Sequence, residues 1–258
     1  MEGYITVTEI PGIKASREQI ARMYHRYHFS SSFCKGKDVL EVACGAGMGL
    51  GYLKRFARKV VGGDIDNNIL EYAKRQYDGR KDIEVRKLDA HTLPFSDDSI
   101  DVVILYEAIY YLRQPEKFIE EASRILKMNG SLLICSVNKD WPDFNPSPFS
   151  TRYLSAPELF QLLNDKFSDI QFYGAFASNS GSMKGKVFSL IKRAAVRLHL
   201  IPKTMKGKEF FKRLFFGNLV SIPPEIEEGM VEYMPPTPIS YDQHHSQYKV
   251  LYAVASNK

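Results

Sequence analysis

Short apolar runs recur along the chain and alternate with stretches in which apolar residues are three or four positions apart. The runs indicate buried strands and cover residues 38–43, 59–65, 83–89, 99–106, 131–137, 169–173 and 247–254. After the first run, Leu50, Leu53 and Ala57 have helical spacing. This alternation predicts an α/β fold with a mostly parallel, seven-stranded sheet and crossover helices on both faces.

Helix start signals occur before this pattern and within it. Ser16 and Gln19 form a capping box, in which each side chain bonds the backbone N–H of the other, ahead of the first strand. Ser155 and Glu158 form a second one after the fifth strand. A proline-interrupted loop in between carries Trp141, and we interpret it as a wall of a ligand site or, equally well, as a packed surface loop.

Four glycines follow the first strand, at alternate positions 45, 47, 49 and 51. A glycine-rich turn between a strand and a helix lets a ligand approach the backbone and the N–H groups at the helix N-terminus. The spacing does not match Gly-x-Gly-x-x-Gly, because Leu50 stands where the third glycine is needed. The turn also lacks the Gly-Lys pair of a phosphate-binding loop, so neither a dinucleotide nor a triphosphate is favoured.

Acidic side chains lie near the carboxyl ends of the first three strands. Glu41 precedes Gly45 by four residues, Asp64 ends the second strand and Asp89 ends the third. The carboxylate of Glu41 would repel a phosphate and suits a ligand that carries positive charge, whereas Asp64 can accept hydrogen bonds from ribose hydroxyls. Ligands of such sheets bind beyond the carboxyl ends of the strands, so the three acids should converge on one site.

At these positions the chain resembles the class I S-adenosylmethionine-dependent methyltransferases, particularly the small-molecule group called methyltransferase type 11. The resemblance covers roughly residues 36–138. It rests on four motifs in the family's order, Leu-Glu-Val-Ala-Cys-Gly-Ala-Gly (40–47), Gly-Gly-Asp-Ile-Asp (62–66), Asp-Ala-His-Thr-Leu-Pro-Phe (89–95) and Ser-Ile-Asp-Val-Val-Ile-Leu-Tyr-Glu-Ala (99–108). It implies a Rossmann-like fold and S-adenosyl-L-methionine as cofactor, with S-adenosyl-L-homocysteine as product.

The resemblance also implies individual cofactor contacts. The loop from Glu41 to Gly47 would lie against the methionine part, Asp64 would bind the ribose, Asp89 the adenine amine, and Tyr106 would close the floor. The implied set is Glu41, Ala43, Cys44, Gly45, Gly47, Asp64, Ile65, Asp89, Ala90 and Tyr106. Ala43 departs from the family, which usually has glycine there, but it keeps a small side chain.

Each element also has a simpler interpretation. A glycine-rich turn is commonly only a turn, and an acid at a strand end is commonly solvated. Asp64 can instead cap the helix that begins near Asn67. The order of the motifs along one α/β pattern is what favours a cofactor site over these interpretations.

Composition indicates a globular protein. The chain has 258 residues, 44% of them hydrophobic, and contains no apolar run of membrane-spanning length and no signal-peptide pattern at its start, so we expect a cytoplasmic protein. The three cysteines, Cys34, Cys44 and Cys135, are widely spaced and odd in number, which indicates neither a disulfide framework nor a metal site.

The net charge of +5 is concentrated in one segment. Residues 183–217 contain ten of the 35 Lys and Arg and one of the 30 Asp and Glu, so this segment carries +9 and the remainder −4. Apolar residues within it have helical spacing, which predicts a basic helical hairpin inserted between strands six and seven. It is interpreted as a hairpin packed on the core, a lid over the acceptor, or a docking surface for an anionic membrane or anionic substrate.

These patterns divide the chain into four segments. They are an N-terminal covering-helix region (1–35), a cofactor-binding core (36–180), the basic helical insertion (181–240) and the final strand of the core (241–258).

The methyl acceptor is less constrained than the cofactor. A sulfonium methyl is already electrophilic, so the protein must align it and exclude water, and must supply a base if the acceptor is a hydroxyl. The candidate bases are His25, His28, His244 and His245, although each is more commonly an ordinary surface or core histidine. The candidate acceptor-binding residues are Tyr110, Tyr111 and Trp141.

Enzymes that methylate amino groups of nucleic acids typically carry Asn or Asp-Pro-Pro-aromatic after strand four, where this chain has Tyr106-Glu-Ala-Ile-Tyr. A nucleic-acid partner is therefore not expected. We predict methyl transfer to a small molecule, on an oxygen of a glycan-type, lipid-linked or natural-product acceptor. Two alternatives stay open, a non-catalytic cofactor-binding module and an RNA methyltransferase anchored by the basic insertion.

Overall fold

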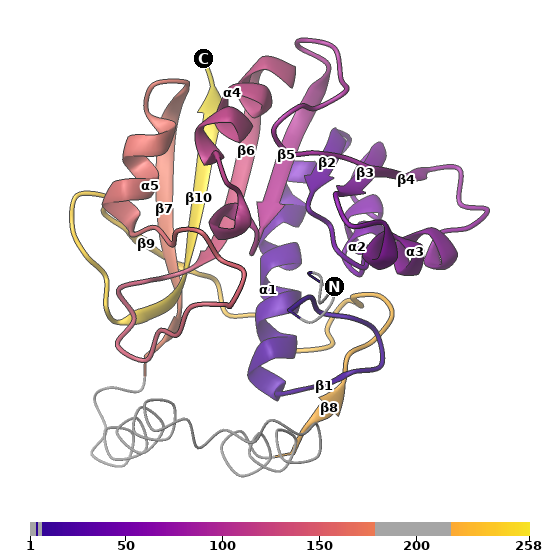
Figure 1. Ribbon diagram of the computed structural model, residues 1–258, viewed down its shortest axis with the longest axis horizontal. Coiled ribbons are helices and arrows are strands. Elements are labelled where there is room, and N and C mark those ends of the chain that lie inside the picture. The colour runs from indigo at the N-terminus through magenta and orange to yellow at the C-terminus, as the bar shows by residue number, and fades with distance from the viewer. Residues whose placement is uncertain (1–3, 5–6, 179–217) are drawn as a thin grey trace.

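A single mixed sheet forms the centre of the computed structural model, which describes residue 4, residues 7–178 and residues 218–258. The strand order is β4-β3-β2-β5-β6-β10-β7-β9 (Figure 1). The strands are β2 (Asp38–Val42), β3 (Lys59–Asp64), β4 (Ile83–Lys87), β5 (Ile100–Tyr106), β6 (Leu126–Val137), β7 (Phe167–Ala177), β9 (Thr237–Ile239) and β10 (Tyr248–Asn257). The first five in this order pair in parallel, and β10 is antiparallel to both β6 and β7.

The predicted α/β architecture is confirmed, with one addition at the edge of the sheet. All seven predicted strands are present, and β9 is an eighth that pairs antiparallel with β7. Its three residues include Pro238, which is typical of an edge strand because proline cannot donate a ladder hydrogen bond. The apolar pattern did not indicate a strand this short.

Helices cover both faces of the sheet. They are α1 (Arg17–Cys34), α2 (Leu50–Lys54), α3 (Asn67–Gln76), α4 (Pro115–Ile125) and α5 (Ala156–Leu163), with a short 3₁₀ turn at Ile109–Tyr111. Val39 and Ile104 pack with α1, α2 and α3, whereas their neighbours Leu40 and Val103 pack with α4 and α5. This alternation follows from the two-residue period of a strand and gives the sheet two buried faces.

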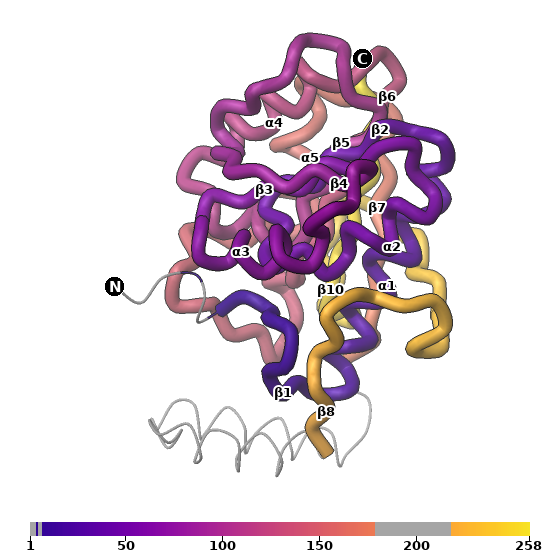
Figure 2. The backbone as a smooth tube through the Cα atoms, turned by 90° about the vertical axis from the view of Figure 1, so that its right-hand side faces the viewer, coloured from indigo at the N-terminus to yellow at the C-terminus, as the bar shows by residue number. Residues whose placement is uncertain are grey.

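The N-terminal helix forms where the capping box predicts. Ser16 Oγ accepts from the backbone N–H of Gln19, whose side chain accepts from the N–H of Ser16. Just before this helix, β1 (Lys14–Ala15) pairs antiparallel with β8 (Val220–Ser221) (Figure 2). The chain that follows residues 179–217 is therefore attached to the N-terminal segment through β8.

The basic helical hairpin predicted for residues 183–217 lies outside the described residues. Within the described ranges, no helix is long and apolar enough to cross a membrane.

Candidate active site

The carboxyl edge of four adjacent strands brings the predicted cofactor residues together. In β2, Glu41 is in register with Gly62 of β3 and Ile104 of β5. Asp64 ends β3 and Tyr106 ends β5, on either side of β2. Side chains that are far apart in sequence thus surround the turn that follows β2.

The turn after β2 has an unusual backbone. Ala43, Gly45 and Gly47 all have positive φ, of 56°, 58° and 75°. This left-handed conformation suits glycine and is less favourable for Ala43, the position where the family usually has glycine. A Cβ at Gly47 would lie 2.6 Å from the Cβ of Ala73 in α3, so the turn also needs glycine for close packing.

Glu41 is a buried acid with a vacant hydrogen-bonding position. Its side chain is 1% exposed, and Oε1 accepts a hydrogen bond of 2.7 Å from the hydroxyl of Tyr27 in α1. Oε2 has no partner among the described residues. Burial raises the pKa of Glu41 to about 7. An ionised, unpaired carboxylate oxygen at this depth fits a ligand that brings a positive charge.

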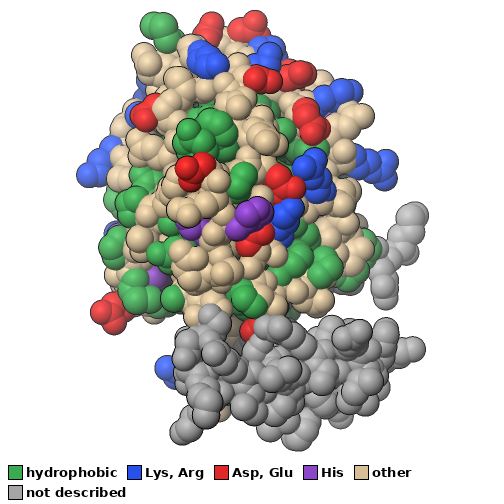
Figure 3. All heavy atoms as spheres, turned by 90° about the vertical axis from the view of Figure 1, so that its left-hand side faces the viewer, with side chains coloured by type: hydrophobic (Ala, Val, Ile, Leu, Met, Phe, Trp, Pro, Cys, Tyr) green, Lys and Arg blue, Asp and Glu red, His purple; other side chains and the backbone are tan. Residues whose placement is uncertain are grey.

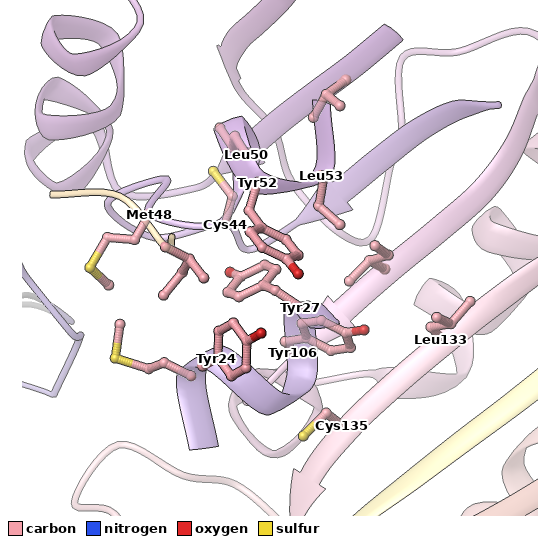
Figure 4. Close-up of a cluster of buried hydrophobic side chains, with 14 of the residues drawn as sticks. Tyr24, Tyr27, Cys44, Met48, Leu50, Tyr52, Leu53, Tyr106, Leu133 and Cys135 are labelled. Atoms are coloured by element: carbon pink, nitrogen blue, oxygen red, sulfur yellow. The ribbon is translucent and has the colours of Figure 1, made fainter. Parts of the chain in front are cut away.

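Tyr27 and Tyr106 lie beside this acid. Figure 4 shows their rings between α1 and the strands, and the ring centroids are 5.7 Å apart. The Tyr106 hydroxyl donates to the backbone carbonyl of Arg26, 3.1 Å away. The contacts of α1 with β2 and β5 therefore consist of aromatic packing and two buried hydrogen bonds.

Asp64 holds the glycine-rich turn in place. Its Oδ2 accepts from the N–H of Gly45 at 3.0 Å and its Oδ1 from the N–H of Asp66 at 2.9 Å. Asp66, and not Asp64, caps α3, by accepting from the N–H of Asn68. The simpler interpretation of Asp64 as a helix cap thus applies to its neighbour. Burial raises the pKa of Asp64, although the two backbone hydrogen bonds oppose this effect.

Asp89 is more open than the other two acids. Its carboxylate is 51% exposed and lies 2.7 Å from Nδ1 of His91, and a backbone hydrogen bond from His91 lowers the pKa of Asp89. Ile65, next to Asp64, is 50% exposed, whereas Cys44 and Ala90 are buried. This arrangement suits a flat ring that packs on the exposed side chain of Ile65 and hydrogen bonds to the half-exposed carboxylate of Asp89.

Glu107 follows β5 on the other side of the turn. It has a positive φ of 51° and accepts a 2.8 Å hydrogen bond from the hydroxyl of Tyr110. Burial raises the pKa of Glu107, and Arg26 acts in the opposite direction. The ring of Tyr110 stacks on Tyr153 at 4.2 Å. The predicted acceptor residue Tyr110 thus forms an aromatic wall with Tyr153 and bonds the carboxylate of Glu107.

The other predicted acceptor residues lie on the same side. The Tyr111 hydroxyl donates to Ser147 Oγ at 2.9 Å. The Trp141 ring has two cations near it, with the guanidinium carbon of Arg22 at 5.7 Å and Nζ of Lys249 at 5.6 Å from its centroid.

The four candidate histidines engage other groups. His25 is buried and donates from Nε2 to the carbonyl of Glu232, and burial lowers its pKa. Nδ1 of His28 lies 3.0 Å from the Tyr52 hydroxyl, and Nε2 of His245 donates to the carbonyl of Ser240. The ring of His244 is 68% exposed and pairs with Asp140. Of the predicted acceptor residues, Tyr110 bonds directly to Glu107, and Trp141 follows Asp140, the partner of His244.

Several residues of this region were not selected from the sequence. Arg26 is buried and forms a 2.5 Å ion pair with Glu9, and a Cβ at Gly45 would lie 3.1 Å from Cγ2 of Thr8. Tyr4 packs edge-on against Tyr111 at 5.6 Å. The available signal was Arg26 itself, a charge within the apolar stripe of α1. The N-terminal segment thus lies across the turn after β2.

Comparison with known proteins agrees with this geometry. A methyltransferase domain model matches residues 40–134. A protein of Mycolicibacterium smegmatis that is named a "probable S-adenosylmethionine-dependent methyltransferase" is 30% identical over 177 residues, which are 64% of this chain and 67% of that protein. One of Mycobacterium tuberculosis with the same kind of name is 33% identical over 150 residues. The match spans 55% of this chain and about half, 53%, of that relative's length.

The fold is also shared with solved structures. An S-adenosylmethionine-dependent methyltransferase from Thermotoga maritima superposes with a TM-score of 0.60 and 16% identity, over 93% of this chain and 92% of that one. This likeness concerns the fold alone. The relative from Mycolicibacterium smegmatis and the domain model show that the chain belongs to the S-adenosylmethionine-dependent methyltransferases, here with the class I fold, and that its cofactor is S-adenosyl-L-methionine.

Proposed function

We propose that this methyltransferase acts on a hydroxyl oxygen of a small-molecule acceptor of the glycan-type, lipid-linked or natural-product class. The observation that carries the proposal is the Glu107–Tyr110 pair, a carboxylate of raised pKa beside an aromatic wall and one strand away from Glu41. A hydroxyl must lose its proton as it is methylated, and a carboxylate whose pKa is raised towards neutrality is an effective base.

The proposed roles of the chain's own residues follow from their contacts. Glu41 would hold the positively charged part of the cofactor through its unpaired oxygen, and Asp64 would hold the ribose while it keeps Gly45 in place. When bound, S-adenosyl-L-methionine supplies an electrophilic methyl group. Glu107 would accept the proton of the acceptor hydroxyl, with Tyr110 fixing the orientation of its carboxylate.

Exclusion of water is assigned to the N-terminal segment. Tyr4 packs on Tyr111 and Phe149, Thr8 lies against Gly45, and Glu9 pairs with Arg26. A cover over the reacting atoms keeps competing water away from them and strengthens electrostatic interactions within the site.

The experiment that tests the proposal is methyl transfer to a fractionated small-molecule extract, with labelled S-adenosyl-L-methionine and mass spectrometry of the products. O-methylated products are expected, together with S-adenosyl-L-homocysteine. Products methylated only on nitrogen or carbon would contradict the oxygen assignment. Binding of the cofactor without any turnover would favour a non-catalytic module, and methylation of added RNA would favour an RNA methyltransferase.

The change Asp64→Ala is expected to weaken binding of S-adenosyl-L-homocysteine by about 1–3 kcal/mol, because hydrogen bonds to a carboxylate are charge-assisted. Isothermal titration calorimetry measures this directly. The matched control is Asp66→Ala, which removes the cap of α3 and should reduce the free energy of unfolding by about 1 kcal/mol while leaving the affinity nearly unchanged. Equal affinities in wild type and a folded Asp64→Ala protein would refute the ribose assignment.

Cofactor affinity is expected to depend on pH through Glu41. Because its pKa is raised to about 7, the carboxylate is increasingly protonated below that pH, and affinity for S-adenosyl-L-methionine should fall by up to about tenfold per pH unit. The change Glu41→Gln should weaken binding at pH 8 and abolish this dependence. Calorimetry between pH 5.5 and 8.5, at about half-unit steps, tests both statements.

The raised pKa of Glu41 can also be tested on the stability of the cofactor-free protein. The pKa of Glu41 is higher in the folded chain than its ordinary value of 4.5, so its contribution to the free energy of unfolding is present at low pH and is lost as the pH rises through about 7. In Tyr27→Phe the carboxylate loses its hydrogen bond, so the midpoint of the pH dependence should move upwards. A downward movement would contradict the assignment.

A further inference from the structure

A cluster of charged and aromatic side chains lies at the carboxyl ends of β6 and β7. Arg22 of α1 is close to two rings, with its guanidinium carbon 5.7 Å from the centroid of Trp141 and 5.6 Å from that of Phe176. Lys249 is the second residue of β10 and approaches Trp141 to 5.6 Å. Trp141 follows β6 and Phe176 is near the end of β7, so three strands and α1 meet at this cluster.

The cluster holds two cations with one shared counter-charge. Glu18 accepts from Arg22 at 2.6 Å and from Lys249 at 2.8 Å. Burial acts to raise the pKa of Glu18, but Arg22 and Lys249 lower it overall, so the carboxylate is ionised at neutral pH. The nearby acid Asp140 is already paired with His244. The three directly bonded groups, Glu18, Arg22 and Lys249, therefore retain one positive charge.

The cations are too enclosed to be ordinary surface charges. Their side chains are only 20% and 14% exposed. Nε of Arg22 is buried and has no hydrogen-bond partner in the part of the chain that the structure describes. Most buried donors in proteins are paired, and an enclosed cation with an unused N–H is a favourable position for an oxyanion.

The cluster also has a fixed relation to the proposed methyl-transfer site. Arg22 is one helical turn from Arg26, and both cations lower the pKa of Glu107. The aromatic wall of Tyr110 and Tyr153 packs beside Glu107. An acceptor with a hydroxyl at Glu107 and an oxyanion at Arg22 would reach from this wall to the cluster. On the face drawn in Figure 3, histidine, acidic and basic side chains lie next to one another near the middle.

We propose that Arg22 and Lys249, held beside Trp141, bind an oxyanion of the acceptor, a carboxylate or a phosphate carried on a flat ring. The position of the hydroxyl end rests on the proposed function. The oxyanion subsite itself is defined by Glu18, Arg22, Trp141 and Lys249 and can be tested without methyl transfer.

Trp141 is the only tryptophan of the chain and therefore reports on this subsite directly. The 258-residue chain, saturated with S-adenosyl-L-homocysteine, is titrated with benzoate, phenyl phosphate and benzamide while tryptophan fluorescence is recorded. Benzoate and benzamide have the same ring and nearly the same shape but differ in charge. We expect a saturable change with benzoate or phenyl phosphate, weakened by added salt, and none with benzamide. The tighter of the two anions identifies the oxyanion.

Variants connect the signal to the proposed residues. Arg22→Met should weaken anion binding by about tenfold or more, and Arg22→Lys by less, because lysine keeps the charge without the planar fork. Glu18→Gln removes the shared counter-charge and should strengthen binding several-fold. The control Arg58→Met changes an exposed arginine that pairs with Asp38 at the opposite edge of the sheet, and should have no effect.

The outcomes are decisive in both directions. Equal responses to benzoate and benzamide, or anion binding unchanged in Arg22→Met, would overturn the proposal. Retained affinity for S-adenosyl-L-homocysteine shows that a variant is folded. If Arg22→Met does not fold, two other variants decide: Lys249→Met should lose anion affinity, and Glu18→Gln should gain it. Anion binding together with products methylated only on nitrogen would leave the subsite established and refute the oxygen assignment.

Discussion

Replacing Glu107 with glutamine is expected to lower kcat by about a hundredfold to ten-thousandfold, the contribution typical of a positioned general base. Glutamine has nearly the same shape and keeps an oxygen that can accept from Tyr110, but it cannot take up a proton. Affinity for S-adenosyl-L-homocysteine should be nearly unchanged. Steady-state kinetics on the acceptor that the methyl-transfer experiment identifies, with calorimetry in parallel, separates the two effects.

The pH profile gives a sharper test of the same residue. In the wild type, the rate should fall on the acid side as Glu107 becomes protonated, and this acid limb should be absent from Glu107→Gln. The hydrogen bond from Tyr110 lowers the pKa of Glu107, so Tyr110→Phe should move the limb to higher pH. A Glu107→Gln protein with wild-type kcat would contradict the assignment, and an acid limb that persists in it would point to a different base.

The change Gly45→Val is expected to weaken cofactor binding by more than about 3 kcal/mol, beyond the effect of Asp64→Ala. Gly45 has a φ of +58°, which a β-branched residue adopts only with strain of about 1–3 kcal/mol. Its Cβ would lie 3.1 Å from Cγ2 of Thr8, and its methyl groups would take space assigned to the methionine part of the cofactor. Calorimetry measures the affinity, and thermal unfolding measures the strain.

The control variant Gly79→Val separates the effect of backbone strain from that of steric crowding by the new side chain. Gly79 has a φ of +78°, and a Cβ there would meet no atom within 4 Å among the described residues. It should show a similar loss of thermal stability with cofactor affinity retained. If Gly45→Val binds the cofactor as Gly79→Val does, the turn after β2 does not contact the methionine part.

The parts of the fold that could be predicted are those set by neighbouring residues. Both capping boxes are four-residue patterns whose hydrogen bonds depend on local geometry, and both form as expected. The seven strands follow from the short apolar runs along the chain. By contrast, β9 is held by pairing with β7, more than 60 residues earlier in the chain, and its three residues carry no pattern of their own.

The candidate site shows the same division. Strand ends located Glu41, Asp64 and Tyr106 on adjacent strands, because the carboxyl ends of parallel strands share an edge. Residue type alone favoured the histidines as bases, yet their partners are decided by distant segments such as the carbonyls of Glu232 and Ser240. A pattern along the chain cannot indicate such partners.

The hydrogen bond from Tyr27 to Glu41 and the pair of Arg26 with Glu9 depend on how α1 crosses the sheet. The spacing of residues within α1 predicted its apolar stripe. It did not predict which polar groups the side chains of Arg26 and Tyr27 would contact. The backbone conformation of the turn after β2 was hard to predict for a different reason. Ala43 has the left-handed conformation that its residue type disfavours, so only its place in a family motif indicated its role.

The position of β10 has a consequence for the newly synthesised chain. β10 lies between β6 and β7, but about 70 residues separate the end of β7 from its start. A ribosome that has released β7 must add this whole stretch before the strand that joins the two halves of the sheet becomes available. Until then β6 and β7 each present an unpaired edge, the kind of surface that pairs with other chains. A chaperone that covers these edges, or fast translation that shortens the interval, should therefore raise the yield of folded protein.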